Sequence, residues 1–190
     1  MRLDHIAYRV KNRYKSARFF EECLGYVIGT EFQIEFDDGS KADCLALVPP
    51  DVRSEDTKLW RYFALQATTY AGIGSPTAYE KHEYHAAPEI FVSDGPDGSI
   101  VGEWVNERGG VGGIHHIAYQ VEDVGEEMAI WKEKGYAEFL SDKPLECPGL
   151  KQVFTKPSEL TGVIYELISR EGKGFCEINV KGLMESTKEL

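Results

Sequence analysis

The chain has 190 residues, of which 42% are hydrophobic, so it is long enough for one substantial core or two small cores built together. Its 32 acidic and 21 basic residues give a net charge of −11, which argues against a nucleic acid or a membrane as partner, because both require clustered positive charge. No apolar stretch reaches the roughly 18–20 residues that cross a bilayer, and residues 1–5 lack the apolar run of a signal peptide. We therefore expect a soluble, cytoplasmic globular protein that acts on a small molecule, and the sequence leaves a homodimer open.

The four cysteines, Cys23, Cys44, Cys147 and Cys176, are scattered along the chain. No two of them have the short spacing of a zinc-binding or redox-active pair. We therefore predict that all four are ordinary reduced thiols.

An internal repeat organises the chain. Residues 3–10 read Leu-Asp-His-Ile-Ala-Tyr-Arg-Val and residues 114–121 read Ile-His-His-Ile-Ala-Tyr-Gln-Val, so four consecutive positions are identical. An amphipathic segment with helical spacing follows each copy: the first ends at Gly25, and the second is capped by Asp123 and ends at Gly135. Each copy thus begins with a strand, a helix and a second strand.

Further segments complete both copies. The predicted strands are 26–36, 41–48 and 88–93 in the first copy, and 150–157 and 162–169 in the second. Residues 49–87 form an insertion with one strand of its own at 62–67, a helix over 99–107 links the copies, and a last helix covers 177–190.

Two βαβββ units in tandem, neither able to cover its own sheet, should pair their sheets into one cupped, mixed β-sheet. The fold class is therefore α+β. We place the first module at residues 1–97, including the insertion 49–87, the linker helix and glycine-rich link at 98–112, and the second module with its C-terminal helix at 113–190.

Two histidines occupy the same position in the two repeated strands. The alternation of a strand places His5 and Ala7 on one face of the first strand, and His116 and Ala118 on the corresponding face of the second. A lone histidine in a strand is usually a hydrogen-bonded core residue, but its recurrence beside a small alanine favours a metal ligand.

Glu166 is a candidate third ligand, because it is a single carboxylate in the otherwise apolar segment 164–168. A buried glutamate without a partner is costly, so we expect it to meet a cation, with an exposed edge-strand glutamate as the alternative. His5, His116 and Glu166 would form the set of two histidines and one carboxylate that is associated with non-haem Fe(II) oxygenases.

The repeat also offers a fourth ligand. Glu89, in the last strand of the first module, occupies the place that we take to correspond to Glu166. With Glu89 the site would resemble the Lewis-acid site of an isomerase. A register change of one residue would instead turn Glu89 outward and Ile90 inward, and both arrangements stay open.

The two histidine strands, Leu-Asp-His-Ile-Ala and Gly-Gly-Ile-His-His-Ile-Ala, resemble the metal-binding strands of the vicinal oxygen chelate superfamily. That superfamily is built from paired βαβββ modules around a divalent metal and includes glyoxalase I, methylmalonyl-CoA epimerase and extradiol dioxygenases. The second half is similar to the C-terminal, catalytic part of the 4-hydroxyphenylpyruvate dioxygenase family. The similar segments are Gln-Val-Phe-Thr-Lys-Pro at 152–157, Tyr-Glu-Leu-Ile-Ser-Arg at 165–170, and Gly-Phe at 174–175 followed by Asn179.

This resemblance implies roles for individual residues. His5, His116 and Glu166 would bind the metal, and the residues that line or gate the substrate pocket would be Gln152, Phe154, Phe175 and Asn179. Gln152 and Asn179 are candidates for a catalytic role, as is Glu89 if it faces the site. The sequence departs from the dioxygenase pattern at His115, Ile164 and Val180, where that family has Gln, an aromatic residue and Phe, and it lacks that family's two further N-terminal modules.

The sequence therefore favours a metal-dependent enzyme, a dioxygenase acting on a 2-oxo acid, with Fe(II) as the metal ahead of Co, Zn, Ni or Mn. The first alternative is an isomerase, epimerase or lyase of the glyoxalase and methylmalonyl-CoA epimerase kind, with a glutamate as base. The second is a non-catalytic ligand-binding module. Glu89 separates the two enzymes, because a fourth protein ligand leaves too few coordination positions for a chelating substrate together with O₂.

Overall fold

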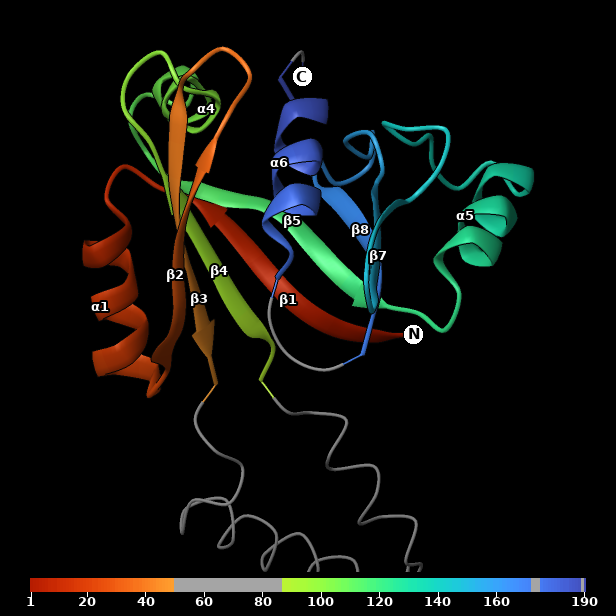
Figure 1. The fold of residues 1–190 in the computed structure, drawn as a ribbon, viewed down its shortest axis with the longest axis horizontal. Helices are drawn as coiled ribbons and strands as arrows, with labels where there is room; N and C mark the ends of the chain where they lie inside the picture. Colours follow the sequence, from red (N-terminus) through yellow and green to blue (C-terminus); the bar gives the residue numbers. More distant parts are fainter. Residues whose placement is uncertain (50–86, 172–174, 189) are drawn as a thin grey trace, which may run out of the picture.

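The computed structural model describes residues 1–49, 87–171, 175–188 and 190. These residues form one eight-stranded mixed sheet with four helices, and the sheet curls into a half-barrel (Figure 1). The α+β class is confirmed. In chain order the elements are β1 (Arg2–Arg9), α1 (Arg13–Leu24), β2 (Val27–Glu35), β3 (Lys41–Val48), β4 (Glu89–Asp94), α4 (Ile100–Glu107), β5 (Gly113–Gln120), α5 (Val124–Glu133), β6 (Leu145–Cys147), β7 (Leu150–Phe154), β8 (Ile164–Arg170) and α6 (Glu177–Ser186). The predicted insertion at 49–87, with its strand at 62–67, lies almost entirely outside the described residues.

The repeat appears directly in the strand order β2-β3-β4-β1-β5-β8-β7-β6. The first copy supplies β2, β3, β4 and β1, and the second supplies β5, β8, β7 and β6. The first strands of the two copies, β1 and β5, pair antiparallel at the centre of the sheet, and each pairs in parallel with the last strand of its own copy. The centre of the sheet is therefore the junction of the two copies.

Polar side chains cap the N-termini of α1, α4 and α5. Asp123 accepts a hydrogen bond from the backbone N–H of Glu126 at the start of α5, as predicted, and Asn12 and Ser99 cap α1 and α4 in the same way. Gly25 ends α1 with a φ of 74°, which a glycine adopts without steric strain.

The helices cover different faces of the sheet. α1 packs outside the first half, on a cluster that includes Ile6 and Tyr8, and α5 packs outside the second half (Figure 1). α6 lies inside the cup, where Val180 and Met184 contact a cluster that includes Ala7 and Phe91 (Figure 1). The predicted orientation of β1, with Ile6 and Tyr8 towards the helix, is confirmed. Within the described ranges, no helix is long and apolar enough to span a membrane.

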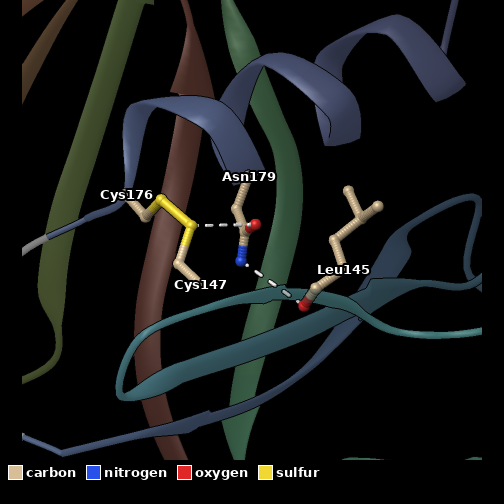
Figure 2. Close-up of a disulfide and its surroundings, with 4 residues drawn as sticks. All are labelled: Leu145, Cys147, Cys176 and Asn179. Atoms are coloured by element: carbon tan, nitrogen blue, oxygen red, sulfur yellow. Dashed lines mark hydrogen bonds between the residues drawn. A yellow bond between two sulfur atoms is a disulfide. The ribbon is translucent and has the colours of Figure 1, made fainter.

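Cys147 and Cys176 form a disulfide (Figure 2), so the prediction of four reduced thiols is wrong for this pair. Their Cα atoms lie 6.6 Å apart although the residues are 29 positions apart in sequence. The β6–β7 turn and the start of α6 bring them together, and short cysteine spacings carry no information about such tertiary contacts. Cys23 and Cys44 are free thiols.

Replacing Cys147 and Cys176 together by serine should lower the free energy of unfolding by about 2–4 kcal/mol, because the unfolded chain loses a cross-link. Urea denaturation measures this loss, and Cys23→Ser, at an exposed free thiol, is the matched control. Alkylation of the unfolded, unreduced protein should label two cysteines per chain, and labelling of all four would contradict the disulfide.

Candidate metal centre

Three side chains from three strands meet at the junction of the two copies. Nε2 of His5 (β1) and Nε2 of His116 (β5) lie 3.3 and 3.1 Å from Oε2 of Glu166 (β8), and the two nitrogens lie 3.2 Å apart. All three side chains are buried, and one ligand atom from each falls within 4.8 Å of the others. The structure thus brings together the three residues that the sequence identifies as candidate ligands.

Strand register places Phe91, not Glu89, in the position that matches Glu166. In the first half Phe91 pairs with Ala7, and in the second half Glu166 pairs with Ala118, the residue that matches Ala7 in the repeat. The predicted correspondence of Glu89 with Glu166 is therefore wrong by two residues. A shift of two keeps Glu89 on the cavity side of the strand but moves it one pleat along β4.

Glu89 belongs instead to an ion-pair cluster around Arg170 at the end of β8. Nη2 of Arg170 lies 3.0 Å from Oε2 of Glu89 and 3.0 Å from Oδ1 of Asp4. Nε of Arg170 donates a second hydrogen bond to Asp4, at 3.1 Å to Oδ2. The Arg170 guanidinium therefore holds Asp4 through a two-point contact.

A β-bulge precedes each of the two histidines. The pairing of β1 with β5 shifts register twice, which leaves Asp4 and His115 as extra residues without a direct partner. Both side chains are buried beside the histidine that follows them. Asp4 Oδ1 lies 2.8 Å from Nδ1 of His5, and Nδ1 of His115 lies 2.9 Å from Nδ1 of His116. Each imidazole is thus held at Nδ1 while its Nε2 faces the cluster.

Gln152 of β7 fixes the carboxylate of Glu166. Its Nε2 donates a hydrogen bond of 2.6 Å to Oε1 of Glu166, and Oε2 is the oxygen near the two histidines. Oε1 of Gln152 is buried and has no hydrogen-bond partner among the described residues. The site therefore contains an unused acceptor next to the candidate ligands.

The electrostatics of the cluster suit a cation. Burial opposes ionisation of Glu166, but His5 and His116 outweigh that effect and hold its pKa well below its usual value. Burial likewise opposes a charge on His5, yet Glu166 and Asp4 raise its pKa to about 9. Positive charge is thus favourable where the three side chains converge, and two imidazole nitrogens with one carboxylate oxygen suit a divalent transition metal.

The cluster opens into a cavity of about 30 Å³, which has room for little more than water. Three aromatic side chains wall it. The ring of Phe154 lies 4.6 Å from that of His116, and Phe175 lies 5.0 Å from both His5 and Phe91, measured between centroids. The surroundings of the candidate ligands are therefore largely apolar.

Three of the four predicted pocket residues, Gln152, Phe154 and Phe175, line this cavity, and Asn179 does not. The Asn179 side chain lies beside the disulfide, with Oδ1 3.1 Å from Sγ of Cys147 and Nδ2 donating to the carbonyl of Leu145 (Figure 2). Asp4 and Arg170 were missed as site residues. Asp4 and His115 stand directly before the repeated histidines, and this shared position is the sequence signal that could have identified Asp4.

Comparison with solved structures identifies the same architecture in two kinds of enzyme. A methylmalonyl-CoA epimerase aligns with a TM-score of 0.61 and 20% identity over 90% of this chain and 97% of that chain. Methylmalonyl-CoA epimerase from Mycobacterium tuberculosis aligns with a TM-score of 0.57 and 17% identity, over 90% and 88%. A mutant of 4-hydroxymandelate synthase from Streptomyces coelicolor aligns with a TM-score of 0.68 and 19% identity, over 98% of this chain and 53% of that chain. At these identities the likeness concerns the fold alone.

The comparison of sequences assigns a superfamily, which the likeness of folds does not. A search of curated proteins finds no match. The family model for the Glyoxalase/Bleomycin resistance protein/Dioxygenase superfamily matches residues 2–160, which is most of the chain. This is the vicinal oxygen chelate superfamily that the histidine strands resemble, and its members are typically metal-dependent. The chain belongs to the glyoxalase/bleomycin resistance protein/dioxygenase superfamily.

Proposed function

We propose that His5, His116 and Glu166 hold one divalent metal, Fe(II) in the active form, and that the protein is a dioxygenase acting on a 2-oxo acid. The observation that carries this proposal is Phe91 at the position matching Glu166. A phenyl ring cannot bind the metal, so three protein ligands would leave half of an octahedral sphere open. When bound, the metal supplies a Lewis acid for two neighbouring substrate oxygens and, as Fe(II), a centre that reacts with O₂.

The residues around the cluster have separate tasks in this proposal. Asp4 and His115 hold the two imidazoles at Nδ1, so that each Nε2 is free of a proton and directed at the metal. Gln152 holds Oε1 of Glu166 and thereby orients Oε2. The Phe154 and Phe175 rings exclude water from the reacting end of the substrate.

The isomerase alternative finds less support in this site. It needs a carboxylate as a base close to the substrate, and the sequence offered Glu89 for that task. Arg170 holds Glu89 in an ion pair of 3.0 Å, which restrains the movement of its carboxylate towards a substrate. The methylmalonyl-CoA epimerases share the fold of this chain, which does not determine the reaction.

The cytoplasm remains our prediction for the location of the protein, on its acidic composition. The Cys147–Cys176 disulfide favours an oxidising compartment, because cytosolic thiols are usually kept reduced. Alkylation of the protein in freshly lysed cells, before air can oxidise its thiols, distinguishes the cytoplasm from an oxidising compartment.

His116→Ala and Glu166→Ala should each bind metal at much less than one ion per chain after Fe(II) or Zn(II) loading, because two ligands do not retain the ion. Elemental analysis after desalting measures the content. Glu89→Gln, which alters a carboxylate outside the cluster, is the matched control and should stay near one ion per chain. Equal metal content in the wild type and both cluster variants would contradict the site.

Asp4→Asn should weaken metal binding by about 10- to 100-fold, because an amide holds the His5 imidazole less firmly than the carboxylate does. Competition with a chromophoric chelator measures the affinity for Zn(II). An affinity equal to that of the wild type would show that the contact between Asp4 and His5 does not support the site.

Phe91→Glu tests the open metal site itself. The new carboxylate would stand where Glu166 stands in the other half, so we expect the metal to be retained and oxygen uptake with 2-oxo acids to fall at least about 100-fold, as a protein ligand replaces an open position. Phe91→Leu keeps the position apolar and should retain most of the uptake. An oxygen electrode with a panel of 2-oxo acids makes the measurement. If the Fe(II)-loaded wild type consumes no oxygen with any of them, the dioxygenase proposal fails.

A further inference from the structure

Arg9 is a buried arginine that has no acidic partner in the part of the chain that the structure describes. Arg9 follows His5 and Ala7 on the cavity face of β1. The residue is 2% exposed and lines the same cavity as the candidate metal ligands. Among the described residues its side chain makes one hydrogen bond, from Nη2 to Oγ1 of Thr187 at 2.9 Å, and forms no ion pair. Buried arginines are normally paired, because a buried charge without a counter-charge is costly.

A second arginine adds positive charge near Arg9. Arg9 and Arg108 both approach the Trp104 ring, with guanidinium carbons 5.9 and 3.7 Å from its centroid. Burial lowers the pKa of Arg9 to about 9, and the positive charge of Arg108 acts in the same direction. This end of the cavity is therefore electropositive in the absence of a ligand.

His115 provides a second unused donor beside Arg9. Its Nε2 is buried, and no hydrogen-bond partner for it exists in the described part of the chain. When His116 presents Nε2 to a metal, the proton of His116 lies on Nδ1, so Nδ1 of His115 accepts the hydrogen bond between the two rings. The proton of His115 then lies on Nε2. The cavity thus contains guanidinium and imidazole donors that hydrogen bonds among the described residues use only in part.

We propose that Arg9 and His115 bind a second carboxylate of the substrate, at the end away from the oxygens that bind the metal. The inference rests on the proposed function, and it restricts the substrate to 2-oxo acids with a carboxylate at each end. The Cα atoms of His5 and Arg9 are about 13 Å apart along the strand, so the two sites can hold opposite ends of one small molecule. The planar guanidinium matches a carboxylate with two parallel hydrogen bonds.

A purely structural role is the competing explanation. Arg9 contacts Thr187, which follows the last turn of α6, so its side chain could serve only to fasten that helix. Thr187→Val removes this contact and keeps the guanidinium. It is therefore the matched control for substitutions of Arg9.

The experiment compares two ligands that differ only in the terminal group. These are 2-oxoglutarate and 5-methyl-2-oxohexanoate, in which an isopropyl group replaces the terminal carboxylate. Calorimetry with the Zn(II)-loaded protein should give wild type a preference for 2-oxoglutarate of about 10- to 100-fold. Thr187→Val should keep the preference, Arg9→Met should abolish it, and Arg9→Lys, which keeps the charge without the planar fork, should retain part of it.

Three results overturn the inference. The first is the absence of a preference in the wild type. The second is a preference of wild-type size in both Arg9 variants, and the third is an equal loss of affinity for both ligands in Arg9→Met. The third result would mean that Arg9 binds the carboxylate next to the keto group or only supports the fold, and circular dichroism separates those causes.

A metal-free arm separates this inference from the proposed function. Glutarate and 5-methylhexanoate carry no keto group and are compared on the protein after chelation. If removal of the metal leaves the affinities of the 2-oxo acids unchanged, chelation by the metal is contradicted, while an Arg9-dependent preference for glutarate still supports the second carboxylate site. If no compound binds in either arm, both ideas are contradicted.

Discussion

The carboxylate of Glu166 is 1% exposed at the centre of the sheet, and its negative charge has to be balanced by neighbours within the fold. The partners come from other strands: His5 from β1, His116 from β5 and Gln152 from β7. Arg170 and Asp4 extend the same network to the end of β8. Folding of the two halves onto each other and neutralisation of this one charge are therefore linked. A sheet whose halves separated would leave the carboxylate with fewer of these partners.

Duplication has produced two halves that share a framework and differ in chemistry. Each contributes a histidine behind a β-bulge, but Asp4 supports one and His115 the other. In the last strand the difference is larger, because Phe91 and Glu166 occupy matching positions. The first half thus supplies an apolar wall where the second supplies a carboxylate. An apolar side chain, Phe91, therefore lines the cavity at the position where a fourth ligand could have stood.

The fold was predictable from sequence because the repeat specified both halves at once, and a helix with a clear apolar stripe followed each repeated strand. Alternation within the repeated strands also placed His5 and His116 on one face, and the single carboxylate of an apolar segment indicated Glu166, although the role of all three as ligands stays a prediction. The correspondence of Glu89 failed because β4 is short and its three apolar residues, at positions 90–92, are consecutive, so its pattern shows no alternation that would mark the register. The disulfide and the place of Asn179 depend on how α6 docks, a tertiary contact that local patterns do not contain.

The small volume of the cavity has a kinetic consequence. A volume of about 30 Å³ holds no organic molecule, so an organic ligand fits beside the buried histidines only if the residues that line the cavity, such as Phe175 and those of α6, move apart. α6 is fastened at both ends, by the disulfide at Cys176 and by Thr187 against the first strand. The observed rate of association should then level off at high ligand concentration, at the rate of this opening, instead of rising in proportion. The movement of the cavity wall would then limit the rate at which a ligand binds.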